Sequence, residues 1–186
     1  MVVAIRKDLI FKICLFGDKN VGKTSLIQKD VQKMFIKEAK APTLIDIATK
    51  EITIDSSKVN LQIWILRYDP RFNFLYSIFT RGISGCIFMY DITNHSSINF
   101  IEQWLIVLKG SLPYNRKKIP LLLVGGKLDL HKNRVISKRK AKKIANKYDF
   151  LKYFECSSKT GQNIEKIFEF LTKSMQKYEF NFNKPI

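Results

Sequence analysis

The octapeptide GDKNVGKT at residues 17–24 has the residue types and spacing to hold phosphate groups. It matches the pattern G-x-x-x-x-G-K-[ST] at every fixed position. Its glycines let backbone N–H groups turn toward phosphate oxygens, and Lys23 would reach the β- and γ-phosphates. The Thr24 hydroxyl can ligate a Mg²⁺ ion that bridges the same oxygens. The octapeptide therefore predicts nucleotide binding, with a surface turn containing glycine and lysine as the alternative.

A second candidate segment, Gly126-Lys127-Leu128-Asp129, follows an apolar run directly. A carboxylate at a strand end can accept hydrogen bonds from N1–H and N2–H₂ of guanine, whereas adenine presents a lone pair there. Asp129 therefore predicts selection of guanine, because a wrong base would leave a buried acceptor unpaired. This tetrapeptide is a weak signal by itself, and a surface turn explains it equally well. A third segment, 156–159, could supply backbone N–H groups to the base oxygen.

Alternating strand-like and helix-like segments must position these loops. The strand-like runs are residues 9–16, 46–54, 59–66, 84–90, 119–124 and 152–156. Stretches with apolar residues three and four apart, typical of helices, are 22–36, 95–109, 137–148 and 163–178. Nearly all-apolar strands between helices imply a mainly parallel α/β sheet covered on both faces, with the ligand at the carboxyl ends of the strands. Asn20 lies where the loop needs a residue that tolerates positive φ.

Length and composition favour a single domain. The chain has 186 residues, 46% of them hydrophobic, which fits one domain with a full core. No signal peptide or long apolar span is visible, so we expect a cytoplasmic protein that can also be peripheral to membranes. Three cysteines lie in or beside strand-like runs and are expected to be reduced core residues.

The formal net charge of +17 suggests an anionic partner. The densest basic stretch, residues 131–143, holds Lys132, Arg134, Lys138, Arg139, Lys140, Lys142 and Lys143 without an acidic residue between them. Apolar residues at helical spacing within it predict a helix whose lysines point outward. The stretch is either a solvated helix in a lysine-rich chain or a surface for an acidic protein or an anionic membrane. No nucleic-acid motif or aromatic interleaving favours binding to nucleic acid.

Several motifs in order make the chain resemble a Ras-superfamily small GTPase, nearest to the Rab-type branch. They are GDKNVGKT, Pro42-Thr43, LQIW, RGISGCIFMYDIT, VGGKLD and ECSSKTGQNIEKIFEFL. The resemblance covers roughly residues 8–178. It implies a P-loop NTPase fold of the α/β class, with a six-stranded, mainly parallel sheet and five helices, over one G domain (1–186, core 8–178) with a short polar tail at 179–186. It also implies GTP or GDP with Mg²⁺ as cofactors, and effector or regulator proteins as partners through switch loops at 37–46 and 65–78.

The same resemblance implies which residues form the site. The nucleotide-binding positions are Asp18, Lys19, Asn20, Val21, Gly22, Lys23, Thr24, Ser25, Phe35, Thr43, Lys127, Asp129, Leu130, Ser157, Ser158 and Lys159. Thr24 and Thr43 are the implied metal ligands, and Phe35 is implied to pack against guanine. Ordinary core packing is the alternative for Phe35, and a loop hydroxyl beside Pro42 is the alternative for Thr43. No residue is assigned a catalytic role.

Switch II departs from the family pattern. Where the family has Trp-Asp-Thr-Ala-Gly-Gln-Glu, this chain reads Trp64-Ile65-Leu66-Arg67-Tyr68-Asp69-Pro70. Ile65 replaces the aspartate that positions Mg²⁺ through its water shell, and an alkyl group cannot do that. Tyr68 replaces the glycine that meets the γ-phosphate and is expected to crowd that position. Asp69 replaces the glutamine that orients the attacking water.

Two milder departures accompany these. Gly126 stands where the family has asparagine, which predicts weaker nucleotide binding, and Ile45 stands where Rab-type sequences usually have glycine. The last six residues contain no cysteine and the chain does not begin with Met-Gly, so we expect no lipid anchor.

These features predict a guanine-nucleotide-binding protein with impaired or absent hydrolysis that acts through partner binding. One alternative is a working GTPase that hydrolyses GTP by a partner-assisted route or with Arg67 or Arg71 at the phosphates. Another is a basic adaptor in which the nucleotide is only structural.

Overall fold

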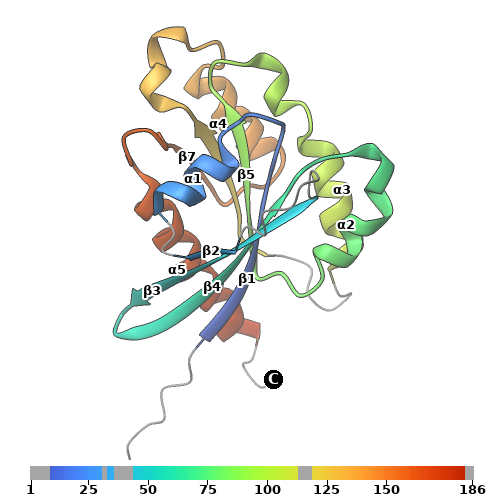
Figure 1. The fold of residues 1–186 in the computed structure, drawn as a ribbon, viewed down its shortest axis with the longest axis vertical. Coiled ribbons are helices and arrows are strands. Elements are labelled where there is room, and N and C mark those ends of the chain that lie inside the picture. Colours follow the sequence, from blue (N-terminus) through green and yellow to red (C-terminus); the bar gives the residue numbers. More distant parts are fainter. Residues whose placement is uncertain (1–8, 31–32, 36–43, 113–118, 183–186) are drawn as a thin grey trace, which may run out of the picture.

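The computed structural model describes residues 9–30, 33–35, 44–112 and 119–182, which contain one seven-stranded sheet in the order β2-β3-β4-β1-β5-β6-β7 (Figure 1). The strands are β1 (Leu9–Gly17), β2 (Lys33–Phe35), β3 (Ile45–Ile54), β4 (Ser57–Leu66), β5 (Gly85–Asp91), β6 (Leu121–Gly126) and β7 (Lys152–Glu155). Strands β2, β3 and β4 pair antiparallel, and the pairs from β4 through β1, β5 and β6 to β7 are parallel.

The predicted α/β class is confirmed, but six strands was an undercount. The additional strand, β2, adds three residues to the edge beside β3. It lies inside 22–36, which the spacing of apolar residues assigned to one helix. A strand of three residues is too short to show the alternation that identifies a strand in a sequence.

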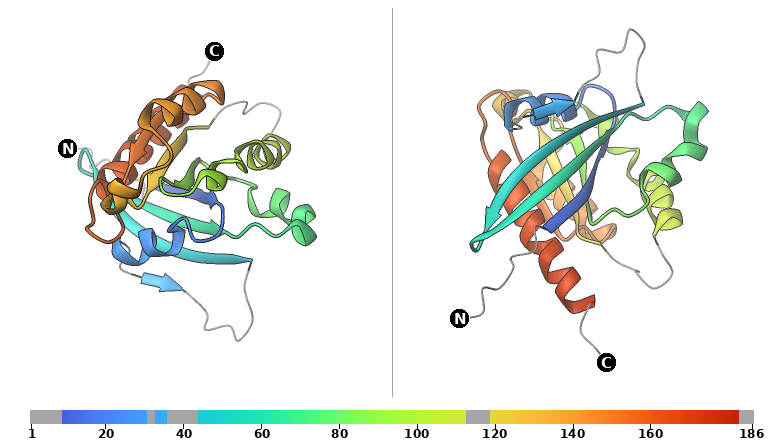
Figure 2. Two further views of the ribbon diagram at one scale, coloured as in Figure 1. Left: turned by 90° about the horizontal axis from the view of Figure 1, so that it is seen from above. Right: turned by 60° about the horizontal axis from the view of Figure 1, so that its bottom comes forward.

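Helices cover both faces of the sheet (Figure 2). The α-helices are α1 (Lys23–Asp30), α2 (Asn73–Phe79), α3 (Ile101–Ser111), α4 (Lys138–Lys147) and α5 (Ile164–Phe182). Three 3₁₀ segments, Pro70–Phe72, His95–Ile98 and Leu128–Asn133, complete the connections in the described part of the chain. Side chains of α1 and α5 pack on one face, and those of α2, α3 and α4 pack on the other.

Several helices differ from the sequence-based expectation: α1 ends at Asp30 within the expected range 22–36, and the range 95–109 begins with the 3₁₀ segment His95–Ile98 before α3. The pattern of apolar residues did not reveal α2, because this seven-residue helix carries apolar side chains on more than one side: Tyr76 is buried, whereas Phe74 and Ile78 are exposed. The helix α5 continues through Phe182. The prediction that 179–186 is a polar tail was therefore wrong for residues 179–182.

The core explains why the central strands read as continuous apolar runs. Every residue of β5 is buried, because helices cover it on both sides. Burying one large aliphatic side chain contributes about 1.5–3 kcal/mol, so these strands fix the sheet firmly beneath the loops at its carboxyl edge. Cys14, Cys86 and Cys156 are buried and free, as expected. Among helices in the described ranges, none combines the length and apolar character needed to cross a bilayer.

Candidate nucleotide-binding site

The P-loop joins the carboxyl end of β1 to the first turn of α1. Gly17 has φ +140°, and a Cβ atom there would lie 2.2 Å from the carbonyl oxygen of Met89 in β5. Only glycine therefore allows the loop to leave the sheet at this point. Gly22 has φ +101°, and Asn20 has φ 60°, which confirms the predicted need for a residue that tolerates this region.

Lys23 is folded back against the P-loop and is only 8% exposed. Its Nζ atom donates hydrogen bonds to the carbonyl oxygens of Gly17 at 2.8 Å and Asp18 at 2.6 Å. Burial lowers the pKa of Lys23 to about 8; the negative charge of Asp18 opposes this change, and the positive charge of Arg67 adds to it. The ammonium group is thus held against the first two residues of the loop.

The segment after β6 lies directly against the P-loop. A Cβ atom on Gly126 would be 2.8 Å from the carbonyl oxygen of Val21, so the backbone there leaves no room for a side chain. A Cβ atom on Gly22 would be 4.0 Å from the hydroxyl oxygen of Ser158. Three segments far apart in the sequence therefore meet at one edge of the sheet. Glycine at position 126 lacks the amide of the family's asparagine, but it also allows this close approach of the two backbones.

A hydrogen bond joins the two predicted base-recognition segments. The buried Ser157 hydroxyl donates to Oδ1 of Asp129 at 2.6 Å, and the backbone N–H of Leu128 donates to the carbonyl oxygen of Cys156 at 2.9 Å. These bonds hold the Asp129 carboxylate in place at the end of β6. A fixed carboxylate is what selection of guanine requires, because its acceptors must meet N1–H and N2–H₂ together.

Asp91 is a residue of this region that the sequence analysis missed. It is buried at the end of β5, and its Oδ2 atom is 2.7 Å from Nζ of Lys127. Burial opposes ionisation of Asp91, but hydrogen bonds from Lys127 and Thr93 outweigh it and lower the pKa of this carboxyl. Lys127 has φ 63°, so this ion pair orients a residue in a strained backbone conformation. The sequence offered one signal for this role, because Asp91 is an acidic residue directly after the apolar run of β5.

The other predicted positions differ in how far they are described. Val21 is buried, Thr24 and Ser158 are half-buried, and Lys19, Ser25, Leu130 and Lys159 are exposed. The backbone of Phe35 lies in β2, but its side chain is outside the described structure. Thr43 and most of the predicted switch loop at 37–46 also lie outside the described residues. The predicted roles of Phe35 and Thr43 therefore remain predictions.

Tyr68 does not occupy the place expected from the sequence. Its ring packs in an aromatic cluster with Phe16, Tyr76, Phe100 and Trp104; its centroid is 5.5 Å from that of Phe100 and 5.7 Å from that of Trp104. This cluster belongs to the face covered by α2 and α3, whereas Val21 belongs to the other face. The prediction that the Tyr68 side chain crowds the γ-phosphate was therefore wrong. Favourable aromatic packing explains its position.

The Tyr76 side chain also holds the loop of residues 67–69 in place. Its buried hydroxyl accepts a hydrogen bond from the backbone N–H of Asp69 at 2.6 Å and donates one to the carbonyl oxygen of Arg67 at 2.7 Å. The hydroxyl thus replaces a backbone partner for both groups. The family pattern gave no signal for this role, which depends on α2 turning the ring beneath residues 67–69.

The Asp69 side chain is paired with an arginine. Its carboxylate forms an ion pair with Arg71 at 2.6 Å. The side-chain hydrogen bond from Arg71 is the main reason that the pKa of Asp69 is lowered to about 2, with a smaller contribution from the positive charge of Lys19. An ionised carboxylate that faces Arg71 and the charge of Lys19 is a poor substitute for a neutral amide that orients water.

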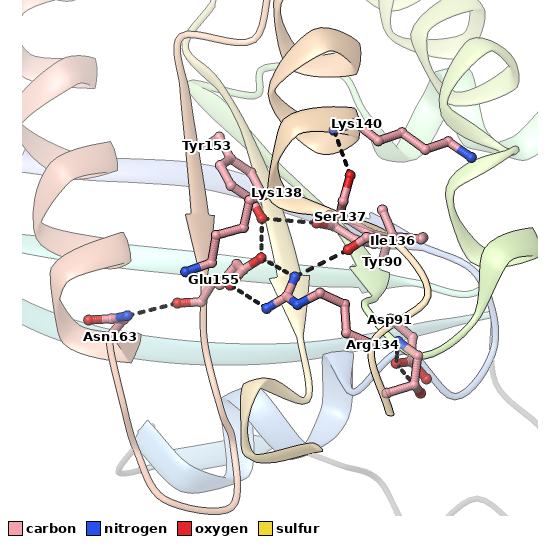
Figure 3. Close-up of polar contacts among 11 residues, drawn as sticks. Tyr90, Asp91, Arg134, Ile136, Ser137, Lys138, Lys140, Tyr153, Glu155 and Asn163 are labelled. Carbon is pink, nitrogen blue, oxygen red and sulfur yellow. Dashed lines mark hydrogen bonds and ion pairs between the residues drawn. The ribbon is translucent and has the colours of Figure 1, made fainter. Parts of the chain in front are cut away.

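Most of the predicted basic stretch is exposed, but Arg134 is not part of that surface. Arg134 donates to both carboxylate oxygens of buried Glu155, at 2.6 and 2.8 Å (Figure 3). Tyr153 also donates to this carboxylate. The ion pair ties the segment before α4 to β7, and α4 itself begins at Ser137, whose hydroxyl accepts from the Lys140 N–H at 3.2 Å. The outward cations are Lys132, Lys138, Arg139, Lys140, Lys142 and Lys143.

A P-loop at the carboxyl edge of a mainly parallel sheet, with the predicted base-recognition segment beside it, is the arrangement of a nucleotide-binding protein of the small-GTPase type. Comparison with known proteins agrees. Residues 12–177 match the model described as Ras family. The GTP-binding protein yptV5 of Volvox carteri is 35% identical over 181 residues, covering 95% of this chain and 87% of the relative.

Two further relatives are Ras-related proteins named Rab-7a. The protein from Paramecium octaurelia is 34% identical over 179 residues, covering 95% of this chain and 86% of the relative. The protein from Dictyostelium discoideum is 31% identical over 187 residues, covering 99% of this chain and 91% of the relative. The chain belongs to the Ras family and is similar to its Rab-type members.

Proposed function

We propose that this chain is a guanine-nucleotide-binding protein with impaired or absent GTP hydrolysis that acts by binding partner proteins. The observation that carries the proposal is the attachment of switch II to the fold. Tyr68 packs into the aromatic cluster, and the Tyr76 hydroxyl bonds to the backbone on both sides of it. A loop held by protein contacts gains little from contacts with a γ-phosphate, so its conformation should depend weakly on the nucleotide.

The choice of guanine rests on the Asp129 carboxylate and its bond from Ser157. Lys23 and the P-loop backbone supply the phosphate site. Because Gly126 replaces the family's asparagine, we expect an affinity below that of typical family members. Adenine nucleotides should bind far more weakly, since adenine cannot donate to both oxygens of Asp129.

Magnesium does not fit the described residues as it fits the family pattern. Ile65 is fully buried in the cluster that contains Val21 and Leu26, so hydrocarbon fills the position where a carboxylate is expected. Thr24 is the candidate ligand among the described residues, and Thr43 lies outside them. Guanine nucleotide with Mg²⁺ is the cofactor set that the family implies, but the usual carboxylate of the magnesium water shell is replaced by the Ile65 side chain.

Two surfaces are candidates for partners. Phe74 and Ile78, four residues apart on α2, are 68% and 55% exposed, which gives switch II an apolar outer face. That face suits an effector or regulator protein that presents apolar side chains. The cations of α4 form the second surface, which suits an anionic membrane or an acidic partner.

The alternative function, a working GTPase, needs a group that aids hydrolysis. The Asp69 carboxylate, which replaces the family's glutamine, is ion-paired with Arg71. A partner could still supply an arginine, which can raise hydrolysis by about 10³–10⁵. Hydrolysis that appears only when a partner is added would favour this alternative.

The proposal is tested by three measurements on the purified chain. Released nucleotide is identified by chromatography after denaturation, single-turnover GTP hydrolysis is timed, and hydrogen exchange of residues 65–78 is compared between GDP and GTP states. We expect retained GTP, hydrolysis slower than in typical family members, and similar exchange in both states. Family-like turnover, or strong protection of 65–78 by GTP alone, would refute the proposal. The triple variant Ile65→Asp, Tyr68→Gly, Asp69→Gln should restore some turnover.

A further inference from the structure

Asp46 and Arg67 place a charged pair beside the P-loop at the edge between β3 and β4. Asp46 is the register partner of Ile65 across these antiparallel strands. Directly opposed side chains lie on the same face of a sheet. Ile65 packs with Val21 and Leu26, so this face is the one that carries the P-loop and α1. The side chain of Asp46 is therefore on the P-loop side.

Arg67 lies on the same face. The Arg67 N–H donates to the carbonyl oxygen of Leu44 at 3.0 Å, which extends the β3–β4 pairing beyond Leu66. Residues two apart on a strand point to the same side, so Arg67 follows Ile65. Its Nη2 atom is 2.5 Å from Oδ2 of Asp46, whose side chain is 3% exposed. The nearly buried Asp46 carboxylate thus holds the Arg67 guanidinium on this face of the sheet.

Lys23 is the neighbouring cation. It is anchored to the P-loop carbonyls of Gly17 and Asp18, and the charge of Arg67 is close enough to act on it. An anion close to both cations would be attracted by the two positive charges together. The side chain of Arg67 is 42% exposed, so an anion can approach it from solvent. The terminal phosphates of a nucleotide in the P-loop are anions of the right chemistry. Arg67 lies at the same edge of the sheet as the P-loop, because Ile65, two residues before Arg67, pairs with Leu15, two residues before Gly17.

We propose that the Arg67 guanidinium binds the terminal phosphates of the bound nucleotide and supplies the charge that Mg²⁺ supplies elsewhere in the family, so that nucleotide binding does not require a divalent cation. This inference rests on the proposed nucleotide binding. A guanidinium has five N–H donors in a planar fork, which lets it keep its bond to Asp46 while it donates to phosphate oxygens. Asp46 is then a positioning residue. The hydrocarbon of Ile65 fits such a site, whereas it does not fit a hydrated metal.

The test measures fluorescent GDP on the full chain, with excess Mg²⁺ and with EDTA. Wild type should show binding and release rates that differ by less than about twofold between the two conditions, and Arg67→Met should weaken binding by about tenfold or more in both, because charge-assisted bonds to phosphate are lost. Arg67→Lys should retain part of the affinity. Arg81→Met, which removes an exposed arginine just beyond the C-terminal end of α2, is the matched control and should bind as wild type does.

The outcomes separate this inference from the proposed function. Release from wild type that is about tenfold faster in EDTA, or an Arg67→Met variant that folds and binds as wild type does, would overturn the role of Arg67 alone. Failure of wild type to bind GDP in either condition would overturn the proposed function, and this inference with it. Thermal unfolding of each variant distinguishes lost binding from lost folding.

Discussion

The Ser157 hydroxyl donates a 2.6 Å hydrogen bond to Oδ1 of Asp129, and the two residues are 28 positions apart in the sequence. This bond connects the loop after β6 to the loop after β7, and it fixes the carboxylate proposed to recognise guanine. The arrangement makes the contributions of the two residues separable by mutation.

Asp129→Ala should weaken GDP binding by roughly 3 kcal/mol, because two hydrogen bonds to a charged acceptor are lost. Ser157→Ala should cost about 1 kcal/mol, since the carboxylate remains but is less well fixed. Calorimetry with GDP and ATP measures both effects. Equal affinities of wild type for GDP and ATP, or no change in Asp129→Ala, would rule out the assignment of Asp129 to the base.

Tyr76→Phe should loosen switch II without removing the aromatic cluster. The variant loses the hydroxyl that bonds to the Asp69 N–H and the Arg67 carbonyl, which should reduce the free energy of unfolding by about 1–2 kcal/mol. Hydrogen exchange should accelerate at residues 67–72. Tyr178→Phe on α5 is the control. Unchanged exchange at 67–72 would show that the Tyr76 hydroxyl does not hold the loop.

Arg134→Met should destabilise the fold by roughly 2 kcal/mol at neutral pH, less than the 3–5 kcal/mol of a fully buried pair because the Arg134 side chain is 19% exposed. Burial raises the pKa of Glu155, but bonds from Arg134 and Tyr153 outweigh it and lower that pKa below 4.5. A lowered carboxyl pKa contributes stability above the unfolded value, and this stability is lost as pH falls below it.

The stability difference between wild type and Arg134→Met should therefore shrink as pH falls below about 4.5. Denaturant unfolding at neutral pH and at several acid pH values measures it, with Arg139→Met as an exposed control. A penalty that stays constant across this range would contradict the role of the Glu155 carboxylate.

The cations of α4 should bind anionic vesicles in a salt-dependent way. Reversal of Arg139, Lys142 and Lys143 to Glu should abolish retention, which for wild type should fall steeply as salt rises. Lys138 is left unchanged because its Nζ atom is 3.8 Å from Glu155. The control reverses Lys166, Lys173 and Lys177, which are exposed on α5 and give the same change in charge. If the α4 variant still binds the vesicles, or if wild type does not bind them at low salt, the cations of α4 are only a solvated helix surface.

The sequence by itself determined the class of fold and the position of the P-loop, and it predicted the base-recognition segments. Continuous apolar strands must be covered on both faces, and fixed spacing in 17–24 can be read without knowing any neighbour. Helix boundaries at α4 and most of α5 also followed, because their apolar residues recur along one face. These are local properties, so the chain shows them directly.

Only the tertiary structure decided where the replaced switch II residues lie. Tyr68 turned toward α3 because aromatic rings were available there, and no local pattern shows which rings meet. The pairing of Asp46 with Arg67 depends on the register of β3 against β4. The ion pair of Asp91 with Lys127 and the close approach of Gly126 to Val21 form because separate strands end at the same edge of the sheet. Such contacts join residues distant in sequence, and their energies depend on packing that a linear pattern does not contain.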